Sequence, residues 1–194
     1  MKEADLKRFV NPPVLVGENV VLRKMTPKDV IDVNEYASDE LVPKYLLWKP
    51  HPSIDYTKKY LKHVEKCYKK GTFYDWAIEY GGKVIGTCGF TSFSIENQCG
   101  EIGYVLNSGY WGKGLARESA LLVIKYGFEV LELNRIEARY MAENTQSRRV
   151  MEKCDMKFEG VLRSSIFSKG KFHDIGVCSI LRAEYINNKI GVDF

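Results

Sequence analysis

The chain has 194 residues, of which 45% are hydrophobic and 28% are charged, and these values are typical of a globular protein. A chain of this length can bury a core for one domain without disulfides or metal ions. Its 29 basic and 25 acidic residues give a net charge of +4 without an arginine-rich block, so the charge pattern gives no support for nucleic-acid binding. No apolar run approaches the roughly 20 residues of a membrane span.

The N-terminal sequence and the cysteines both favour a cytoplasmic protein. Residues 1–10 include charged side chains throughout and lack the apolar centre of a signal peptide. The five cysteines are odd in number and scattered, without a C-x-x-C pair, which is typical of reduced thiols. Because no histidine cluster stands near them at ligand spacing, we expect no metal site.

The period of the apolar residues changes along the chain and predicts alternating types of element. In chain order these are a strand over 19–24, helices over 26–37 and from 53 or 55 to 70, strands over 74–80, 83–93 and 100–106, a helix over 114–132, a strand over 135–140, a helix over 145–153, and strands over 158–168 and 172–181. The helix over 114–132 has the strongest apolar stripe. This order predicts an α/β (α+β) protein with a mixed sheet flanked by helices.

The segment from Glu101 to Arg117 indicates a phosphate-binding turn, because a strand runs through glycines directly into a long helix. The first backbone N–H groups of a helix are unpaired and partly positive, so they can hold a phosphate. Gly112 and Gly114 lack the Cβ atoms that would block close approach. A tight turn without a ligand is the other interpretation of the same pattern.

Two blocks of the sequence resemble the GNAT superfamily of N-acetyltransferases. Trp111-x-x-Gly114-x-Ala116 is similar to the pyrophosphate loop of that family, with tryptophan in the place of Arg or Gln, as in the branch of Rim-type ribosomal-protein N-acetyltransferases. Residues 144–160 resemble the downstream block N-x-x-S-x-x-V/L-x-E-K-x-G-F-x-x-E-G. The matching positions are Asn144, Ser147, Val150, Glu152, Lys153, Glu159 and Gly160. Asp155 and Met156 replace the usual Gly-Phe, and Asp takes a left-handed cap less easily than Gly.

The resemblance covers about residues 16–185 and implies the GNAT fold. We therefore expect a mixed six- to seven-stranded sheet with splayed central strands, flanked by about four helices. The expected organisation is a single acetyltransferase domain over 1–194, with an N-terminal extension over 1–17 and a C-terminal tail over 186–194.

The resemblance also implies a site for acetyl-CoA as the acetyl-donor cosubstrate, without a metal. The strand edge would bind pantetheine and the loop would bind the pyrophosphate. The implied residues are Tyr104, Val105 and Leu106, then Gly112, Lys113, Gly114, Leu115, Ala116 and Arg117, and further along Asn144 and Ser147. A backbone N–H near Val105 would stabilise the oxyanion.

Two residues are candidates for the chemistry. Glu101 resembles the catalytic glutamate of several GNAT enzymes and would act as general base through water, although an ordinary strand carboxylate fits the pattern equally well. Ser147 would protonate the leaving thiolate, or would be a first-turn helix residue only. Many relatives place a tyrosine acid where this chain has Met151, so we do not expect that route.

The acceptor is less well determined by the sequence than the donor. Tyr45, Trp48, Trp76 and His173 are weak candidates for the substrate cleft, and the first three could equally belong to the core. The predicted activity is transfer of acetyl from acetyl-CoA to a primary amine, which is either a protein N-terminal α-amine such as that of a ribosomal protein or a small amine. A non-catalytic acyl-CoA-binding module is the alternative, and a homodimer is an open expectation.

Overall fold

The computed structural model describes Asp5 and residues 7–190, and the chain divides into two compact units. One unit, called here the loop unit, consists of Lys2–Gly89 and Tyr104–Leu122. The other, called the hairpin unit, consists of Phe90–Gly103 and the described residues from Val123 onward. Each unit is described by itself below.

Eight strands form one mixed sheet in the order β1-β2-β3-β4-β5-β6-β8-β7. Their bounds are Leu15–Val16 for β1, Val21–Arg23 for β2, Tyr74–Tyr80 for β3, Lys83–Ser94 for β4, Cys99–Leu106 for β5, Arg135–Met141 for β6, Lys157–Ser168 for β7 and Lys171–Leu181 for β8. The pair β5–β6 is parallel, and β1–β2, β2–β3, β6–β8 and β7–β8 are antiparallel. The predicted strands are all present, and the two-residue β1 is an addition to them.

The described residues form five α-helices and four short 3₁₀ helices. The α-helices are α2 (Val30–Ala37), α3 (Ile54–Lys70), α4 (Leu115–Glu129), α5 (Thr145–Glu152) and α6 (Arg182–Ile190), and the 3₁₀ helices are η1 (Lys7–Val10), η2 (Pro27–Asp29), η3 (Val42–Tyr45) and η4 (Ser108–Tyr110). None of the helices in the described part of the chain has the length and apolar character needed to cross a membrane.

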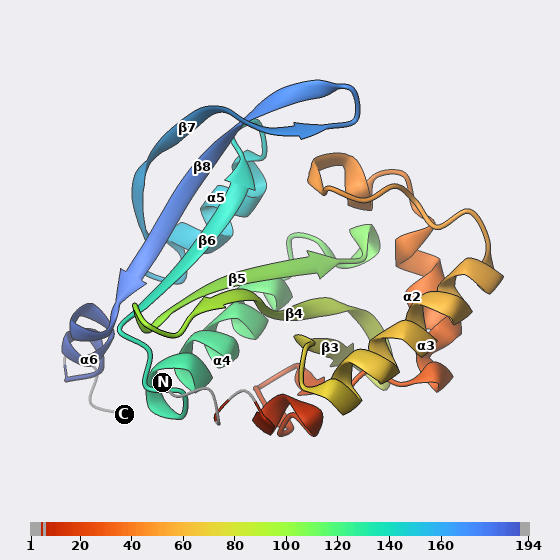
Figure 1. Cartoon of the computed structure of the whole chain (residues 1–194), viewed down its shortest axis with the longest axis horizontal. Coiled ribbons are helices and arrows are strands. Elements are labelled where there is room, and N and C mark those ends of the chain that lie inside the picture. The colour runs from red at the N-terminus through yellow and green to blue at the C-terminus, as the bar shows by residue number, and fades with distance from the viewer. Residues whose placement is uncertain (1–4, 6, 191–194) are drawn as a thin grey trace. The chain divides into compact units, whose positions relative to one another are not determined.

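In the loop unit, α2 and α3 lie side by side (Figure 1). Ser53 caps α3 by accepting a hydrogen bond from the Tyr56 amide, and Gly71 ends the helix at φ 66°. The buried face of α3 carries Leu61, Val64 and Tyr68, which pack into one core cluster with residues of α2 and the sheet. Burial of such side chains stabilises the unit by about 1.5–3 kcal/mol each.

In the hairpin unit, β6, β8 and β7 run side by side and α5 packs against them (Figure 1). β6 pairs with β8 from Arg135↔Leu181 to Met141↔Ile175, and β7 returns to β8 through the turn at Lys169 and Gly170.

The turn after α5 forms although Asp155 replaces glycine there. Asp155 takes φ 60°, and the Met156 amide donates to the Met151 carbonyl at 3.1 Å. Asp is one of the few residues with a side chain that enters the left-handed region at modest cost.

Two predicted helix bounds differ from the structure. The helix expected over 26–37 begins as the 3₁₀ turn η2, in which the Thr26 amide binds the Asp29 carboxylate at 2.7 Å. The helix expected to reach residue 132 ends at Glu129, because Glu132 adopts φ 55° and the Leu133 amide turns back to the Gly127 carbonyl at 3.0 Å. In addition, α6 covers residues 186–190, which the sequence had assigned to the tail, while 191–194 lie outside the described residues.

Candidate active site

In the loop unit, the end of β5 and the start of α4 are joined by a tightly hydrogen-bonded turn. The Asn107 amide donates to the Ile85 carbonyl at 2.7 Å, and its side-chain oxygen accepts from the Gly109 amide at 3.0 Å. The Trp111 indole N–H donates to the Leu106 carbonyl at 2.8 Å. This bond ties the loop back to the strand, which gives Trp111 a structural reason to stand at the first position of the motif.

The two glycines of the motif have backbone conformations that a side chain would strain. Gly112 has φ 77° and Gly114 has φ 83°, and apart from each glycine and its chain neighbours, no heavy atom of the described residues lies within 4 Å of the place a Cβ would occupy on either. α4 begins immediately afterwards at Leu115, and the Glu118 amide is the donor to the Gly114 carbonyl at 3.0 Å. The loop is therefore an open, exposed backbone surface leading into a helix N-terminus, and it fits a pyrophosphate.

The charged side chains beside this loop are two basic residues and one glutamate that is hydrogen-bonded to the preceding chain. Lys113 Nζ lies 4.9 Å from the centre of the Tyr110 ring, and Arg117 is exposed. Glu118 faces the preceding chain, where it accepts hydrogen bonds from the Asn19 amide at 2.7 Å and the Val20 amide at 3.2 Å. Its negative charge is thus held by backbone donors of the turn before β2.

The predicted pantetheine strand follows the pattern of a half-buried strand. Tyr104 and Val105 are partly buried, Leu106 is 7% exposed, and Val105 packs against the core cluster of the loop unit. β4 lies close along it, since a Cβ on Gly86 would come within 2.1 Å of the Val105 carbonyl oxygen. The recorded pairing of β5 with β6 covers Cys99 to Ile102.

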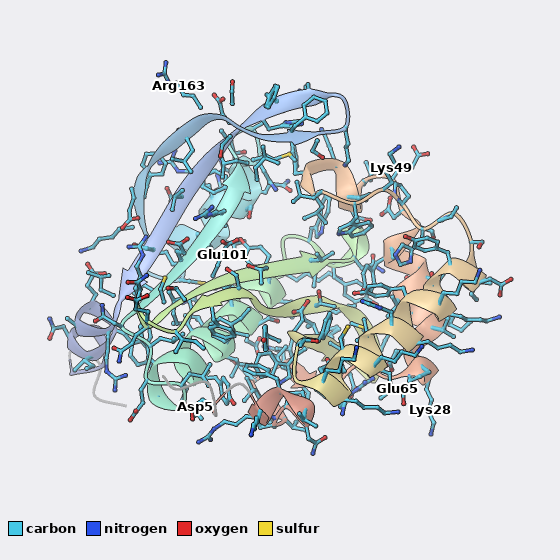
Figure 2. The ribbon with its side chains drawn as sticks, viewed as in Figure 1. Asp5, Lys28, Lys49, Glu65, Glu101 and Arg163 are labelled. Atoms are coloured by element: carbon cyan, nitrogen blue, oxygen red, sulfur yellow. The ribbon has the colours of Figure 1, made fainter. Side chains whose placement is uncertain are left out.

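In the hairpin unit, Glu101 lies on β5 (Figure 2) directly opposite Glu137 of β6. Glu101 Oε2 is 3.4 Å from Arg139 Nε, and Arg139 Nη2 is 3.0 Å from Glu137 Oε1. The Glu101 side chain is 25% exposed, so it keeps contact with solvent. The arrangement places one guanidinium between two carboxylates, a feature that the sequence pattern did not reveal.

Asn144 and Ser147 meet at the start of α5, as the second motif predicts. Asn144 caps the helix by accepting a hydrogen bond from the Ser147 amide at 3.1 Å. Ser147 is partly exposed in the first turn, and Met151 is buried.

His173 and Asp174 do not form a dyad with each other. His173 Nε2 lies 3.1 Å from the Ser168 carbonyl, and Asp174 Oδ1 accepts from the Ser164 amide at 2.7 Å. Both residues line an open cavity of about 420 Å³ together with Met141, Ala142, Glu143 and Phe172. His173 is therefore placed at a cavity within the hairpin unit.

Of the aromatic residues proposed for the cleft, Trp76 is a core residue. It is fully buried, its indole N–H donates to the Pro13 carbonyl at 2.8 Å, and its ring contacts Phe9. This corrects its expected place in the cleft, because a side chain sealed on all sides cannot meet a substrate. Tyr45 and Trp48 are both partly exposed.

His51 lies at the centre of an aromatic cluster in the loop unit. Its ring centre lies 5.8 Å from that of Trp48, 4.8 Å from that of Tyr56 and 5.4 Å from that of Tyr60. Its Nδ1 is 2.9 Å from the Thr57 hydroxyl, and partial burial lowers the pKa of the imidazole. No local sequence signal marks such a cluster, because its members come from a loop and a helix.

Comparisons with known proteins agree with the two motifs. Residues 19–157 match the family model described as "Acetyltransferase (GNAT) domain". The uncharacterized N-acetyltransferase p20 of Bacillus licheniformis is 36% identical over 173 residues, which cover 88% of this chain and 97% of p20. A solved GNAT-family acetyltransferase from Bacillus anthracis is 31% identical with a TM-score of 0.79, and the match covers 89% of this chain and 100% of that one.

More distant relatives differ in the acceptor that they are named for. The spermidine N(1)-acetyltransferase of Vibrio cholerae is 22% identical over 174 residues, covering 89% of this chain and 98% of the relative. RimL, a ribosomal L7/L12 α-N-protein acetyltransferase solved in complex with coenzyme A, shares the fold at 19% identity with a TM-score of 0.74, and the match covers 87% of this chain and 98% of RimL. On the family match and the identity to p20, the chain belongs to the GNAT family and is an acetyl-CoA-dependent N-acetyltransferase.

Proposed function

We propose that this enzyme transfers the acetyl group of acetyl-CoA to a primary amine by direct attack, without an acyl-enzyme intermediate. The observation that carries the proposal is the loop of the loop unit, where Gly112 and Gly114 hold left-handed conformations over open space in front of α4. The acceptor is either a protein N-terminal α-amine, such as that of a ribosomal protein, or a small amine.

The cosubstrate would be held by backbone groups more than by side chains. The amides from Gly112 to Arg117 face a pyrophosphate, and the basic side chains of Lys113 and Arg117 add charge. Tyr104 to Leu106 offer strand-edge groups to the pantetheine arm. In the hairpin unit, Asn144 and Ser147 would contact the cosubstrate from the start of α5. Acetyl-CoA supplies an activated thioester carbonyl.

Groups of the protein would then supply the general base, the oxyanion donor and the general acid of the reaction. Glu101 takes the proton of the attacking amine through water, and a backbone N–H near Val105 donates to the oxygen of the tetrahedral intermediate. Ser147 returns a proton to the departing thiolate, since Met151 offers no acid at the tyrosine position of many relatives. Holding amine and thioester together contributes a large part of the rate.

Two features of the chain support proposals for its cellular location and its oligomeric state. A cytoplasmic location fits scattered thiols without disulfides among the described residues. A homodimer is supported by the edge strand β7, where Phe158, Val161 and Leu162 are each 43–45% exposed.

The proposal is tested in two steps with the intact chain. Millimolar acetyl-CoA should raise the melting temperature, because a ligand of the folded state stabilises it by about RT ln(1 + [L]/Kd). Release of free CoA thiol should then be measured with spermidine, propylamine and peptides that carry free N-termini. No shift in melting temperature would refute the proposal. A shift without turnover on any amine would favour the alternative, a non-catalytic acyl-CoA-binding module.

A further inference from the structure

One carboxylate oxygen inside the loop unit has no hydrogen-bond partner. Oδ1 of Asp75, on β3, is buried without a donor anywhere in the described part of the chain, and Asp75 forms no ion pair there. The residue as a whole is partly exposed although this oxygen is not. Buried polar atoms are nearly always hydrogen-bonded, and an unpaired acceptor of this kind calls for a donor.

The neighbouring strand makes room for this carboxylate. A Cβ on Gly89 of β4 would lie 2.7 Å from Asp75 Oδ1 and 2.4 Å from the Asp75 Cα, so only glycine fits beneath the side chain. The Thr87 hydroxyl and the Trp76 amide interact with the carboxyl group and favour its charged form. Burial outweighs them and raises the pKa of Asp75 to about 7. A cation bound beside Asp75 would therefore favour the charged form of this carboxyl group.

Three tyrosines of the two helices lie near Asp75. Burial raises the pKa of the phenols of Tyr36 of α2 and of Tyr60 and Tyr68 of α3, and the nearby charge of Asp75 raises each of them further. The Tyr68 hydroxyl donates to the Asp75 carbonyl at 2.6 Å, while Tyr60 also contacts His51. A carboxylate beside the faces and edges of aromatic rings is complementary to an alkylammonium group.

The position of Asp75 fixes how far such a group would lie from the reacting amine. β3, β4 and β5 are consecutive in the sheet, and Val105 of β5 packs on the same core cluster as Tyr60. Two strand spacings separate β3 from β5, which is about 10 Å. A cation at Asp75 would therefore lie about this far from a group bound along Tyr104 to Leu106 of β5.

We propose that Asp75 binds a second, cationic nitrogen of the acceptor, so that the enzyme prefers amines with an alkylammonium group about 10 Å from the reacting one. This inference rests on the proposed function, because it assigns the acceptor of that reaction. Both an extended polyamine and a peptide with a lysine near its N-terminus carry the required chemistry.

The test compares diaminooctane with octylamine, which has the same length but no second nitrogen, in the wild type and in Asp75→Asn. We expect the wild type to have the lower KM for diaminooctane, and the variant to raise that KM by about 10- to 100-fold, the loss expected for a charged hydrogen bond. The KM for octylamine and for acetyl-CoA should stay unchanged. Diaminopropane, too short to span the two positions, should behave like octylamine.

Separate arms distinguish the natural sources of the ammonium group. Spermidine and a peptide with lysine at its second position are compared with propylamine and the same peptide with leucine there. Equal KM values for diaminooctane and octylamine in the wild type would overturn the inference, and so would a variant that weakens both amines alike, as a structural defect would. If no amine is turned over, calorimetric binding of diaminooctane and octylamine decides the inference independently of the reaction.

Discussion

At the scale of single residues, Glu101 is the candidate whose role depends most on its neighbours. Its carboxylate shares Arg139 with Glu137, at 3.4 Å and 3.0 Å. We expect Glu101→Gln to lower turnover at neutral pH by about 100- to 10,000-fold, the usual contribution of a general base. The affinity for acetyl-CoA should change little. The loss should shrink as the pH approaches the pKa of the acceptor amine, which then loses its proton unaided.

Glu137→Gln is the matched control for this experiment. It removes the other carboxylate on Arg139 without touching Glu101, so it reports what loosening the ion pairs does by itself. Steady-state turnover against pH, at saturating substrates, is the measurement. Wild-type turnover of Glu101→Gln, or equal losses in the two variants, would show that Glu101 is a structural carboxylate.

At the scale of an element, the phosphate loop and the β3–β4 hairpin contain glycines in matching conformations. Gly114 has φ 83° and Gly82 has φ 79°, and around the position of the missing Cβ of each, the part of the chain that the structure describes leaves 4 Å of open space beyond the neighbouring residues. Valine at either position forces a β-branched residue into the left-handed region, at a cost of about 1–3 kcal/mol in folding. Only at Gly114 would the new side chain also stand where the pyrophosphate is proposed to bind.

We therefore expect Gly114→Val to weaken CoA binding by about 100-fold, equivalent to losing one or two charge-assisted hydrogen bonds. Gly82→Val should lose similar stability but keep the wild-type Kd. Calorimetry with CoA and thermal unfolding of both variants give the two quantities. Identical CoA affinities in the two variants would mean that the loop is a turn without a ligand.

At the scale of the whole molecule, the buried Asp75 couples folding to pH. Its folded pKa of about 7 lies above the ordinary value of 3.8, so its contribution to stability is fully present below the unfolded pKa and is lost as the pH rises towards 7. The loss amounts to at most about 4 kcal/mol, at about 1.4 kcal/mol for each pH unit. The Asp75→Asn variant has no carboxyl group at this position, so its stability should not show this loss.

The free energy of unfolding of Asp75→Asn, relative to wild type, should thus rise between pH 5 and 7 (about 1.4 kcal/mol per unit) and level off above. The phenols of Tyr36, Tyr60 and Tyr68 that lie near Asp75 do not titrate in this range, because burial raises their pKa values. The imidazole of His51, whose pKa is lowered by burial, is present in both proteins and cancels in the comparison. A stability difference between the two proteins that does not depend on pH would mean that the pKa of Asp75 is the same in the folded and the unfolded protein. Denaturant unfolding at each pH is the measurement.

The sequence by itself determined seven of the eight strands and four of the five α-helices of the described residues, together with the two motifs, because these depend on neighbours along the chain. Side-chain period, helix caps and left-handed glycines such as Gly114 act over a few residues. Tertiary structure decided that Trp76 is buried in the core and that Arg139 lies between Glu101 and Glu137. It also decided that His51 lies close to the rings of Trp48, Tyr56 and Tyr60. It also decided the environment of Asp75, since burial and missing partners arise only when β3, β4 and α3 pack together. The sequence carries no local signal for them because desolvation and charge pairing depend on distance in space.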